Sequence, residues 1–172
     1  MILKSILENI PFVELKRFSH GGRRLFAMCQ SENDLPSSDE FPGNLGLARK
    51  LMINGYDVYM LGNPNGIRSA DFIATRKNMV YYLEGKTMNG RGSLDELLSK
   101  ASSQSERVGI DIIGTCDIHY ITREMKNAFE HSHPLIEVFL LRGSRIIYVD
   151  RRKLRKKNFE MDFKNEWLGH KK

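Results

Sequence analysis

The apolar residues between Phe41 and Asp150 change repeatedly from helical spacing to short strand-like runs. Helical spacing, with apolar residues three or four positions apart, predicts amphipathic helices, whereas short β-branched and aromatic runs predict strands. The pattern predicts the order helix, three strands, helix, strand, helix, two strands. This order favours a mixed β-sheet flanked by helices, a fold of the α/β (α+β) class. The predicted helices are centred on Leu47–Met52, Leu94–Ala101 and His119–His131, and the predicted strands are Tyr56–Leu61, two within Ser69–Thr87, Arg107–Ile113, Ile136–Leu141 and Arg145–Asp150.

The first 40 residues have a different character. Residues 1–10 place isoleucine and leucine on one helical face, and two strand-like runs flank the turn-forming sequence Ser19–Gly22, which predicts a β-hairpin. The following stretch, Gln30–Glu40, is polar and lacks a periodic apolar pattern. We therefore predict an N-terminal appendage and linker over residues 1–40 and a main domain over residues 41–172.

The segment Ser69–Thr87 contains the charged residues that are the main candidates for a functional site. The turn residues Arg76-Lys77-Asn78 predict an antiparallel hairpin whose second strand ends in Glu84-Gly85-Lys86. Side chains alternate between the two faces of a strand, so Glu84 and Lys86 point the same way. The hairpin is expected to bring Asp71, on the first strand, beside Glu84.

Two carboxylates and an ammonium at adjacent strand ends suit the hydrolysis of a phosphodiester. The carboxylates of Asp71 and Glu84 are hard oxygen ligands for Mg²⁺ or Mn²⁺, and Lys86 is placed to orient water or offset negative charge at phosphorus. The alternative is a structural ion pair at the end of a sheet. We favour the functional interpretation because these charged residues interrupt apolar runs, where an unpaired charge is costly.

Composition narrows the class of protein. The chain has 172 residues, of which 41% are hydrophobic and 28% charged, as in soluble globular domains. No apolar run approaches the ~20 residues of a membrane span, and Glu8 and Asn9 interrupt what a secretory signal would keep apolar. Cys29 and Cys116 lie far apart and outside any CxxC motif, which favours reduced thiols. We expect a cytoplasmic site of action.

The net charge of +6 is concentrated near the C-terminus. Residues 141–172 contain 11 Lys and Arg against 4 Asp and Glu, whereas residues 1–140 contain 16 against 17. A basic segment indicates a polyanionic partner such as nucleic acid, although a solubilising tail gives the same composition. The predicted contacts to nucleic-acid phosphates are Arg151, Arg152, Lys153, Arg155, Lys156 and Lys157.

Several segments carry a resemblance to a known family: NGYDVYML, SADFI, YYLEGKT, the Ser93-capped helix and RVGIDI. Together they resemble the core of the PD-(D/E)XK nuclease superfamily. Within it, the chain most resembles the C-terminal tRNA-cleaving toxin domains of contact-dependent growth inhibition proteins. The resemblance covers about Glu40–Ile113 and implies a restriction-endonuclease-like sheet, a metal-dependent nuclease, tRNA as substrate and an immunity protein as partner. Ala70 stands where that superfamily often has proline.

The resemblance also implies roles for further residues. The motif's Asp falls on Asp71 and its Glu-x-Lys on Glu84 and Lys86. Many members carry a Glu on the first core helix, where this sequence offers only Glu40 or Asn44. Gln104 falls late in the helix after the Glu-x-Lys strand, where related nucleases often have a glutamine, and is either a candidate catalytic residue or a solvated residue at the helix end. Thr87 and Arg68 are candidate phosphate contacts, Thr87 because it follows the lysine and Arg68 because it precedes the strand of Asp71.

Three alternatives remain open at the level of sequence. The first is a DNA endonuclease of the same fold, and the second is a non-catalytic nucleic-acid-binding module on a degenerate nuclease fold. The third is a metal-free ribonuclease that uses His119, His131 or His133, although histidines at helix ends are more often surface or capping residues. Asp111, within an apolar strand, is either a further metal ligand or a hydrogen-bonded core residue.

Overall fold

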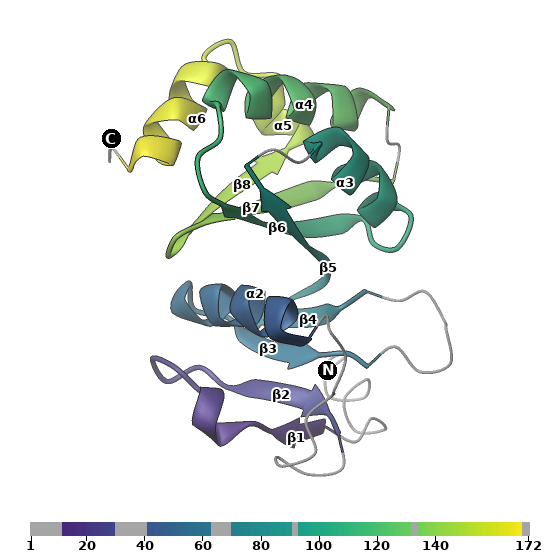
Figure 1. Cartoon of the computed structure of the whole chain (residues 1–172), viewed down its shortest axis with the longest axis vertical. Coiled ribbons are helices and arrows are strands. Elements are labelled where there is room, and N and C mark those ends of the chain that lie inside the picture. Colours follow the sequence, from purple (N-terminus) through teal and green to yellow (C-terminus); the bar gives the residue numbers. More distant parts are fainter. Residues whose placement is uncertain (1–11, 30–40, 63–69, 91–92, 132–133, 170–172) are drawn as a thin grey trace. The chain divides into compact units, whose positions relative to one another are not determined.

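The computed structural model describes residues 12–29, 41–62, 70–90, 93–131 and 134–169. The chain forms two compact units, Met1–Leu83 and Glu84–Lys172. The strands pair with one another in sequence order, with both parallel and antiparallel neighbours. Helices connect or follow them (Figure 1). The predicted mixed α/β class is therefore confirmed.

The first unit contains strands of both orientations and one α-helix within its described residues (Figure 1, purple to teal). β1 is antiparallel to β2, β2 is parallel to β3, and β3 is antiparallel to β4, which is antiparallel to the start of β5. The N-terminal hairpin predicted from the sequence is thus confirmed. The elements are β1 (Phe12–Glu14), the 3-10 helix η1 (Lys16–Phe18), β2 (Leu25–Met28), α2 (Phe41–Ile53), β3 (Asp57–Met60), β4 (Phe72–Arg76) and β5 (Met79–Asn89), whose first residues belong to this unit.

Local sequence explains where the elements of the first unit end. α2 buries the apolar stripe of Leu47 and Leu51, and Gly55 follows the helix with a φ of +89°, which favours glycine. β4 and β5 are joined by Lys77 and Asn78, which both have positive φ. Two consecutive residues of this kind match the twist of an antiparallel hairpin. The predicted hairpin is therefore present, with Phe72 opposite Leu83.

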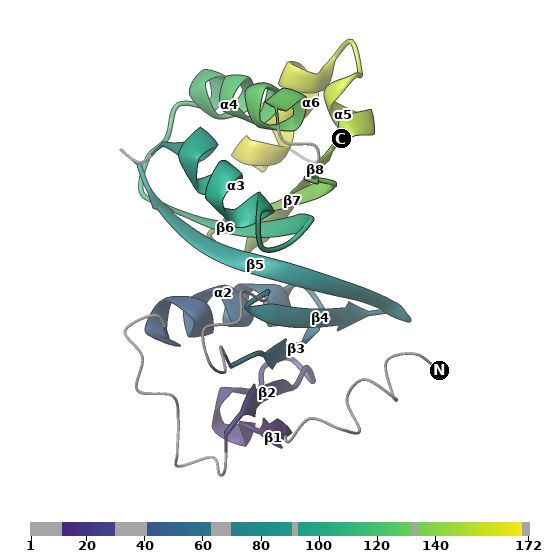
Figure 2. The same ribbon diagram turned by 90° about the vertical axis from the view of Figure 1, so that its right-hand side faces the viewer.

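The second unit is a mixed sheet with its helices on one face (Figures 1 and 2). The end of β5 is parallel to β6, β6 is parallel to β7, and β7 is antiparallel to β8. Ser93 caps the first helix by accepting a hydrogen bond from the Glu96 amide at 3.3 Å, as the sequence predicts. The elements after β5 are α3 (Leu94–Ser102), β6 (Arg107–Ile113), α4 (Ile118–His131), β7 (Glu137–Arg142), β8 (Arg145–Asp150), α5 (Arg151–Leu154) and α6 (Phe159–Leu168).

β5 is longer than the sequence indicates. The expected strand ends at Glu84-Gly85-Lys86, whereas the observed strand continues to Asn89. The reason is a change of partner, because Glu84–Asn89 pairs in parallel with Val108–Ile113 of β6. Glu84 and Lys86 therefore lie in the middle of a strand and not at its end.

The C-terminal basic segment also contains structure that the sequence pattern did not lead us to expect. It forms α5 and α6, and α6 buries Phe159, Phe163 and Trp167 in the core of the second unit. These residues are four positions apart and lie on one face of the helix. The segment is therefore partly a core element.

Two predictions about the N-terminal region stay predictions. The expected helix over residues 1–10 and the polar linker over residues 30–40 lie outside the described residues. The boundary between an appendage at 1–40 and a domain at 41–172 also remains a prediction. In the part of the chain that the structure describes, no helix has both the length and the apolar character needed to cross a membrane.

We expect Phe163→Ala to lower the free energy of unfolding by about 3–5 kcal/mol, because it leaves a cavity in the core of the second unit. Phe163 is fully buried and stacks on Trp167 with ring centroids 5.7 Å apart. Trp167 is the single tryptophan of the chain, so its fluorescence during urea unfolding reports on this unit. Met161→Ala, on the same helix but 57% exposed, is the matched control. Equal unfolding midpoints for the two variants would contradict the assignment of α6 to the core.

Candidate active site

Glu84 and Lys86 lie on the helix-covered face of the second unit. Residues two apart on a strand share a face, so Glu84 and Lys86 share one with Met88, which belongs to the buried core. In the parallel ladder, Glu84 lies opposite Val108 and Lys86 opposite Ile110, and both partners are core residues. An apolar environment therefore surrounds this part of the strand.

The two side chains form a close ion pair. Lys86 Nζ donates a hydrogen bond to Glu84 Oε1 at 2.5 Å. The Glu84 side chain is 2% exposed and the Lys86 side chain is 28% exposed. Removing an ionised carboxylate from water costs several kcal/mol, and a nearby ammonium offsets this cost. The pair thus presents a buried carboxylate with an ammonium that still reaches solvent.

The other face of β5 carries different residues. Gly85 and Thr87 point away from Glu84 and Lys86, and their parallel partners on β6 are Gly109 and Asp111. Asp111 is buried, with 6% of its surface exposed. Neither Thr87 nor Asp111 therefore joins the Glu84–Lys86 pair, and Asp111 is buried on the opposite face.

Asp71 belongs to the first unit, directly before β4. It is half-buried, and its carbonyl oxygen accepts a hydrogen bond from the Leu61 amide at 2.8 Å. This bond extends the ladder between β3 and β4 by one step and fixes the backbone of Asp71. The role of Asp71 as a metal ligand stays a prediction.

Gln104 lies just beyond the helix that was expected to carry it. α3 ends at Ser102, and the Gln104 amide donates to the Ala101 carbonyl at 2.9 Å. Four residues later the chain reaches Val108, the strand partner of Glu84. Gln104 therefore sits in the turn that leads into the strand beside Glu84, half-buried.

The remaining accessory candidates are scattered. Asn44 is half-buried in the first turn of α2, within the first unit. His119 and His131 are exposed near the two ends of α4, and His131 Nδ1 lies 2.9 Å from the Asn127 carbonyl oxygen. Both histidines thus belong to a helix and not to the strand of the ion pair. Glu40, Arg68 and His133 lie outside the described residues.

The basic C-terminal residues divide into two groups. Arg151 donates a hydrogen bond to the Phe129 carbonyl oxygen near the end of α4, and Lys153 contacts the Tyr148 carbonyl oxygen at 2.8 Å and Glu166 at 2.6 Å. These two cations therefore help hold α5 in place. The other four are exposed and available to a polyanion: Arg152, Arg155, Lys156 and Lys157.

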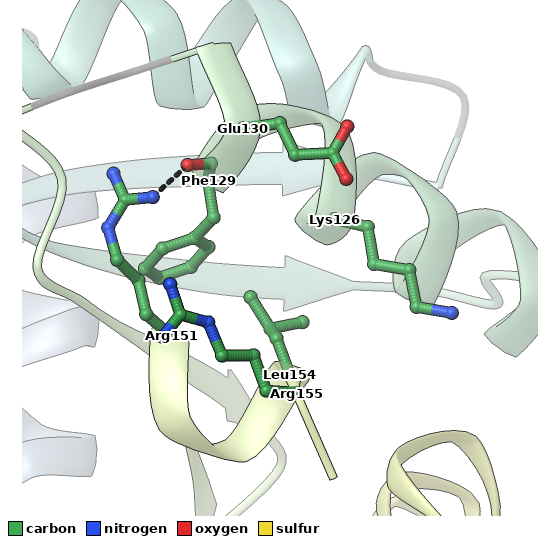
Figure 3. A pocket seen from close by; sticks show the side chains of 6 residues that line it. All are labelled: Lys126, Phe129, Glu130, Arg151, Leu154 and Arg155. Carbon is green, nitrogen blue, oxygen red and sulfur yellow. Dashed lines mark hydrogen bonds between the residues drawn. The ribbon is translucent and has the colours of Figure 1, made fainter. Parts of the chain in front are cut away.

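A pocket of about 350 Å³ lies between α4 and α5 (Figure 3). Arg151 of α5 and Arg155, which follows α5, extend from one side, and Lys126 and Glu130 extend from α4 on the other. Lys126 forms an ion pair with Glu160 at 2.7 Å, and its hydrogen bond and charge lower the pKa of Glu160. Carboxylates on this side of the unit therefore reduce the positive field of the pocket.

The donor set at Glu84 fits a hard divalent cation in its chemistry. Carboxylate oxygens are the ligands that Mg²⁺ and Mn²⁺ prefer, and one carboxylate offers about four lone-pair sites, so an ammonium and a metal can share it. Among the described residues, no three His, Cys, Asp or Glu side chains are grouped so that they could hold a metal. Within the described part of the second unit, Glu84 is therefore the candidate ligand on this strand, and any further ligand stays a prediction.

Comparison with known proteins found no matching family model and no curated protein with a matching sequence. Among solved structures, the chain is similar to one described as "CdiA-CT/CdiI toxin and immunity complex from Burkholderia pseudomallei". The sequence identity is 14%, the TM-score is 0.48, and the match covers 67% of this chain and 91% of the other. The functional argument therefore rests on the residues of this chain.

The Glu84–Lys86 pair is expected to contribute to stability, and a double-mutant cycle measures this contribution. Lys86→Met should lower the free energy of unfolding by about 1–3 kcal/mol, because it leaves a buried carboxylate without its ammonium. Adding Glu84→Gln should recover part of the loss. Urea unfolding followed by Trp167 fluorescence supplies the four free energies, and Lys100→Met, an exposed change on α3, is the control. If the effects of the two single substitutions sum to that of the double substitution within about 0.5 kcal/mol, the two residues are not energetically coupled.

Proposed function

We propose that this chain is a metal-dependent endonuclease that hydrolyses phosphodiester bonds of nucleic acid. The observation that carries the proposal is the Glu84–Lys86 pair, in which a 2%-exposed carboxylate lies 2.5 Å from a partly exposed ammonium. The arrangement keeps the ammonium accessible to a reactant while the buried carboxylate holds it in place. A desolvated titratable group with a specific charge partner is a candidate functional residue.

Glu84 and Asp71 are the proposed metal ligands, Glu84 by its burial and chemistry and Asp71 by its place in the sequence motif. When bound, Mg²⁺ or Mn²⁺ would supply positive charge that stabilises the negative charge developing on the phosphate. The Lys86 ammonium has three N–H donors, of which one is directed to Glu84 Oε1. The remaining donors are suited to orient an attacking water or to bond a phosphate oxygen.

The exposed cations at the C-terminus support a polyanionic substrate. Arg152, Arg155, Lys156 and Lys157 follow closely on one another and are all exposed. Such contacts add affinity and salt dependence without reading sequence. By the resemblance of its motif to tRNA-cleaving toxin domains, tRNA is the favoured substrate, DNA is the alternative, and an immunity protein is the proposed protein partner.

A second candidate function is a non-catalytic nucleic-acid-binding module. It is favoured by one observation, that the described residues contain no group of three metal-ligating side chains. The two functions share the basic surface and differ at Lys86. Cleavage and binding must therefore be measured on the same variants.

We expect Lys86→Ala to reduce cleavage by about a hundredfold or more while binding is largely retained, because the lysine acts in the chemical step. The assay incubates the full chain with total tRNA, duplex DNA and single-stranded DNA, each with Mg²⁺ or with EDTA. Lys100→Ala, an exposed lysine on α3, is the matched control and should cleave normally. Cleavage that continues in EDTA would contradict the proposal that the reaction depends on a metal ion. Salt-sensitive binding without any cleavage would favour the binding module.

We expect Lys156→Ala/Lys157→Ala to weaken binding and to flatten its salt dependence. Removal of each phosphate contact should lower the slope of log K against log salt by about 0.7–0.9. The matched control is Lys100→Ala/Lys164→Ala, which removes the same charge from exposed positions of α3 and α6. Fluorescence anisotropy with labelled tRNA at several salt concentrations supplies both slopes. Equal slopes would show that the C-terminal lysines do not contact phosphates.

A further inference from the structure

The first unit contains a concentration of positive charge that the net charge of residues 1–140 conceals. The segments Lys16–Met28 and α2 contain no Asp or Glu. They contain six cations: Lys16, Arg17, Arg23, Arg24, Arg49 and Lys50. The first four lie in the connection between β1 and β2 and the last two in the second half of α2. Two of these cations, Arg17 and Arg49, are distant in sequence and contact the same aromatic ring, that of Phe18.

The connection between β1 and β2 is held in a defined shape. The buried Leu15 anchors it, and the Phe18 amide donates to the Leu15 carbonyl at 3.0 Å. His20 and Arg23 exchange backbone hydrogen bonds of 3.1 and 2.9 Å around Gly21 and Gly22, which both have positive φ. This is a tight two-residue turn, which sets the backbone position of His20.

A pocket of about 230 Å³ opens between this connection and α2. Its polar groups are two guanidiniums, an imidazole and a hydroxyl, and its apolar groups are an aromatic ring and an isoleucine. None of its lining residues carries a carboxylate, in contrast to the pocket beside α5. The lining residues are Arg17, Phe18, Ser19, His20, Arg49 and Ile53.

Both guanidiniums of the pocket contact one aromatic ring. Arg17 Cζ lies 4.8 Å and Arg49 Cζ 5.4 Å from the centroid of the Phe18 ring. Each contact is a favourable cation–π interaction that places a guanidinium at the pocket. Guanidinium groups pair with phosphate through two parallel hydrogen bonds, which a lysine cannot do.

Asp57 contacts Arg23 and Arg24 of the connection between β1 and β2 and does not line the pocket. Asp57 accepts a hydrogen bond from the Arg24 amide at 2.9 Å, and its other oxygen lies 4.0 Å from Arg23. Asp57 thus acts on the start of β2 and not on the pocket, which it does not line. Arg17 and Arg49 are both exposed to solvent.

We propose that this pocket binds a phosphodiester group of a nucleic-acid strand, with Arg17 and Arg49 holding the phosphate and Phe18 and Ile53 contacting the attached sugar or base. The combination of a fork-shaped cation pair with an aromatic and an aliphatic side chain matches a nucleotide unit better than a bare carboxylate. The inference rests on the proposed function for the identity of the polymer, but it does not involve Glu84 or Lys86. The pocket serves binding and takes no part in the chemical step.

Arg17→Ala/Arg49→Ala should weaken binding of labelled tRNA or single-stranded DNA by about tenfold or more, since hydrogen bonds to charged groups are the stronger class. The binding is measured by fluorescence anisotropy with the full chain in EDTA, so that metal-dependent cleavage does not interfere. Lys100→Ala/Lys164→Ala removes the same charge elsewhere and should have a smaller effect. Arg17→Lys/Arg49→Lys keeps the charge but loses the paired hydrogen bonds of the guanidinium groups. Its binding affinity should lie between those of the wild type and the alanine variant.

The outcomes separate this inference from the proposed function. Equal affinities for Arg17→Ala/Arg49→Ala and its control would overturn the pocket while leaving the endonuclease intact. If the wild-type chain binds neither tRNA nor DNA, both this inference and the proposed nucleic-acid substrate are rejected. Displacement of the nucleic acid by polyglutamate as effectively as by unlabelled tRNA would overturn the assignment to phosphate. Cleavage abolished in Lys86→Ala without a change in binding bears on the proposed function alone.

Discussion

The burial of the Glu84 carboxylate is the constraint on which the candidate site depends. A charged group at 2% exposure in the side chain must have a compensating charge, and Lys86, two residues further on the same strand face, supplies it at 2.5 Å. Strand geometry makes this possible because residues two apart share a face, and Gly85 between them adds no side chain on the other face. The parallel ladder with β6 then fixes the register, because a slip of one residue would turn both charges to the opposite face. The chemistry of the pair is thus a consequence of strand pairing.

The features that could be predicted from the sequence are those that local interactions determine. The Lys77-Asn78 turn, the Ser93 cap and the glycine after α2 each depend on neighbours within four residues, and each is present. The prediction was wrong at β5, because Glu84 and Lys86 interrupt an apolar run and resemble the end of a strand. The continuation to Asn89 depends on β6, and such non-local pairing leaves no signal in β5 itself. An ion pair of these charges is the structural alternative that the sequence analysis did not favour, and the length of the strand could not be predicted.

The net charge of long segments concealed two features: an apolar core helix within the basic C-terminal segment, and neighbouring cations within the nearly neutral N-terminal region. In the C-terminal segment, the dense Lys and Arg obscured the spacing of Phe159, Phe163 and Trp167, which is a clear helical signal and places α6 in the core. In the N-terminal region, acidic residues elsewhere cancelled the cations around Phe18 in the total. Only the fold places Arg49 of α2 over the same ring as Arg17. The sign of the charge on a surface therefore depends on which residues the fold brings together. The net charge of a sequence segment is a poor guide to it.

The two kinds of charge in this molecule differ in how they respond to ionic strength. The exposed cations, which are Arg17, Arg49, Arg152, Arg155, Lys156 and Lys157, act through water, where charges separated by more than about 8 Å are largely screened at physiological salt. The Glu84–Lys86 pair is mostly shielded from solvent, so dissolved ions weaken it much less. Burial thus divides the charges by their physical behaviour, with salt-sensitive cations on the surface and a salt-resistant pair on β5.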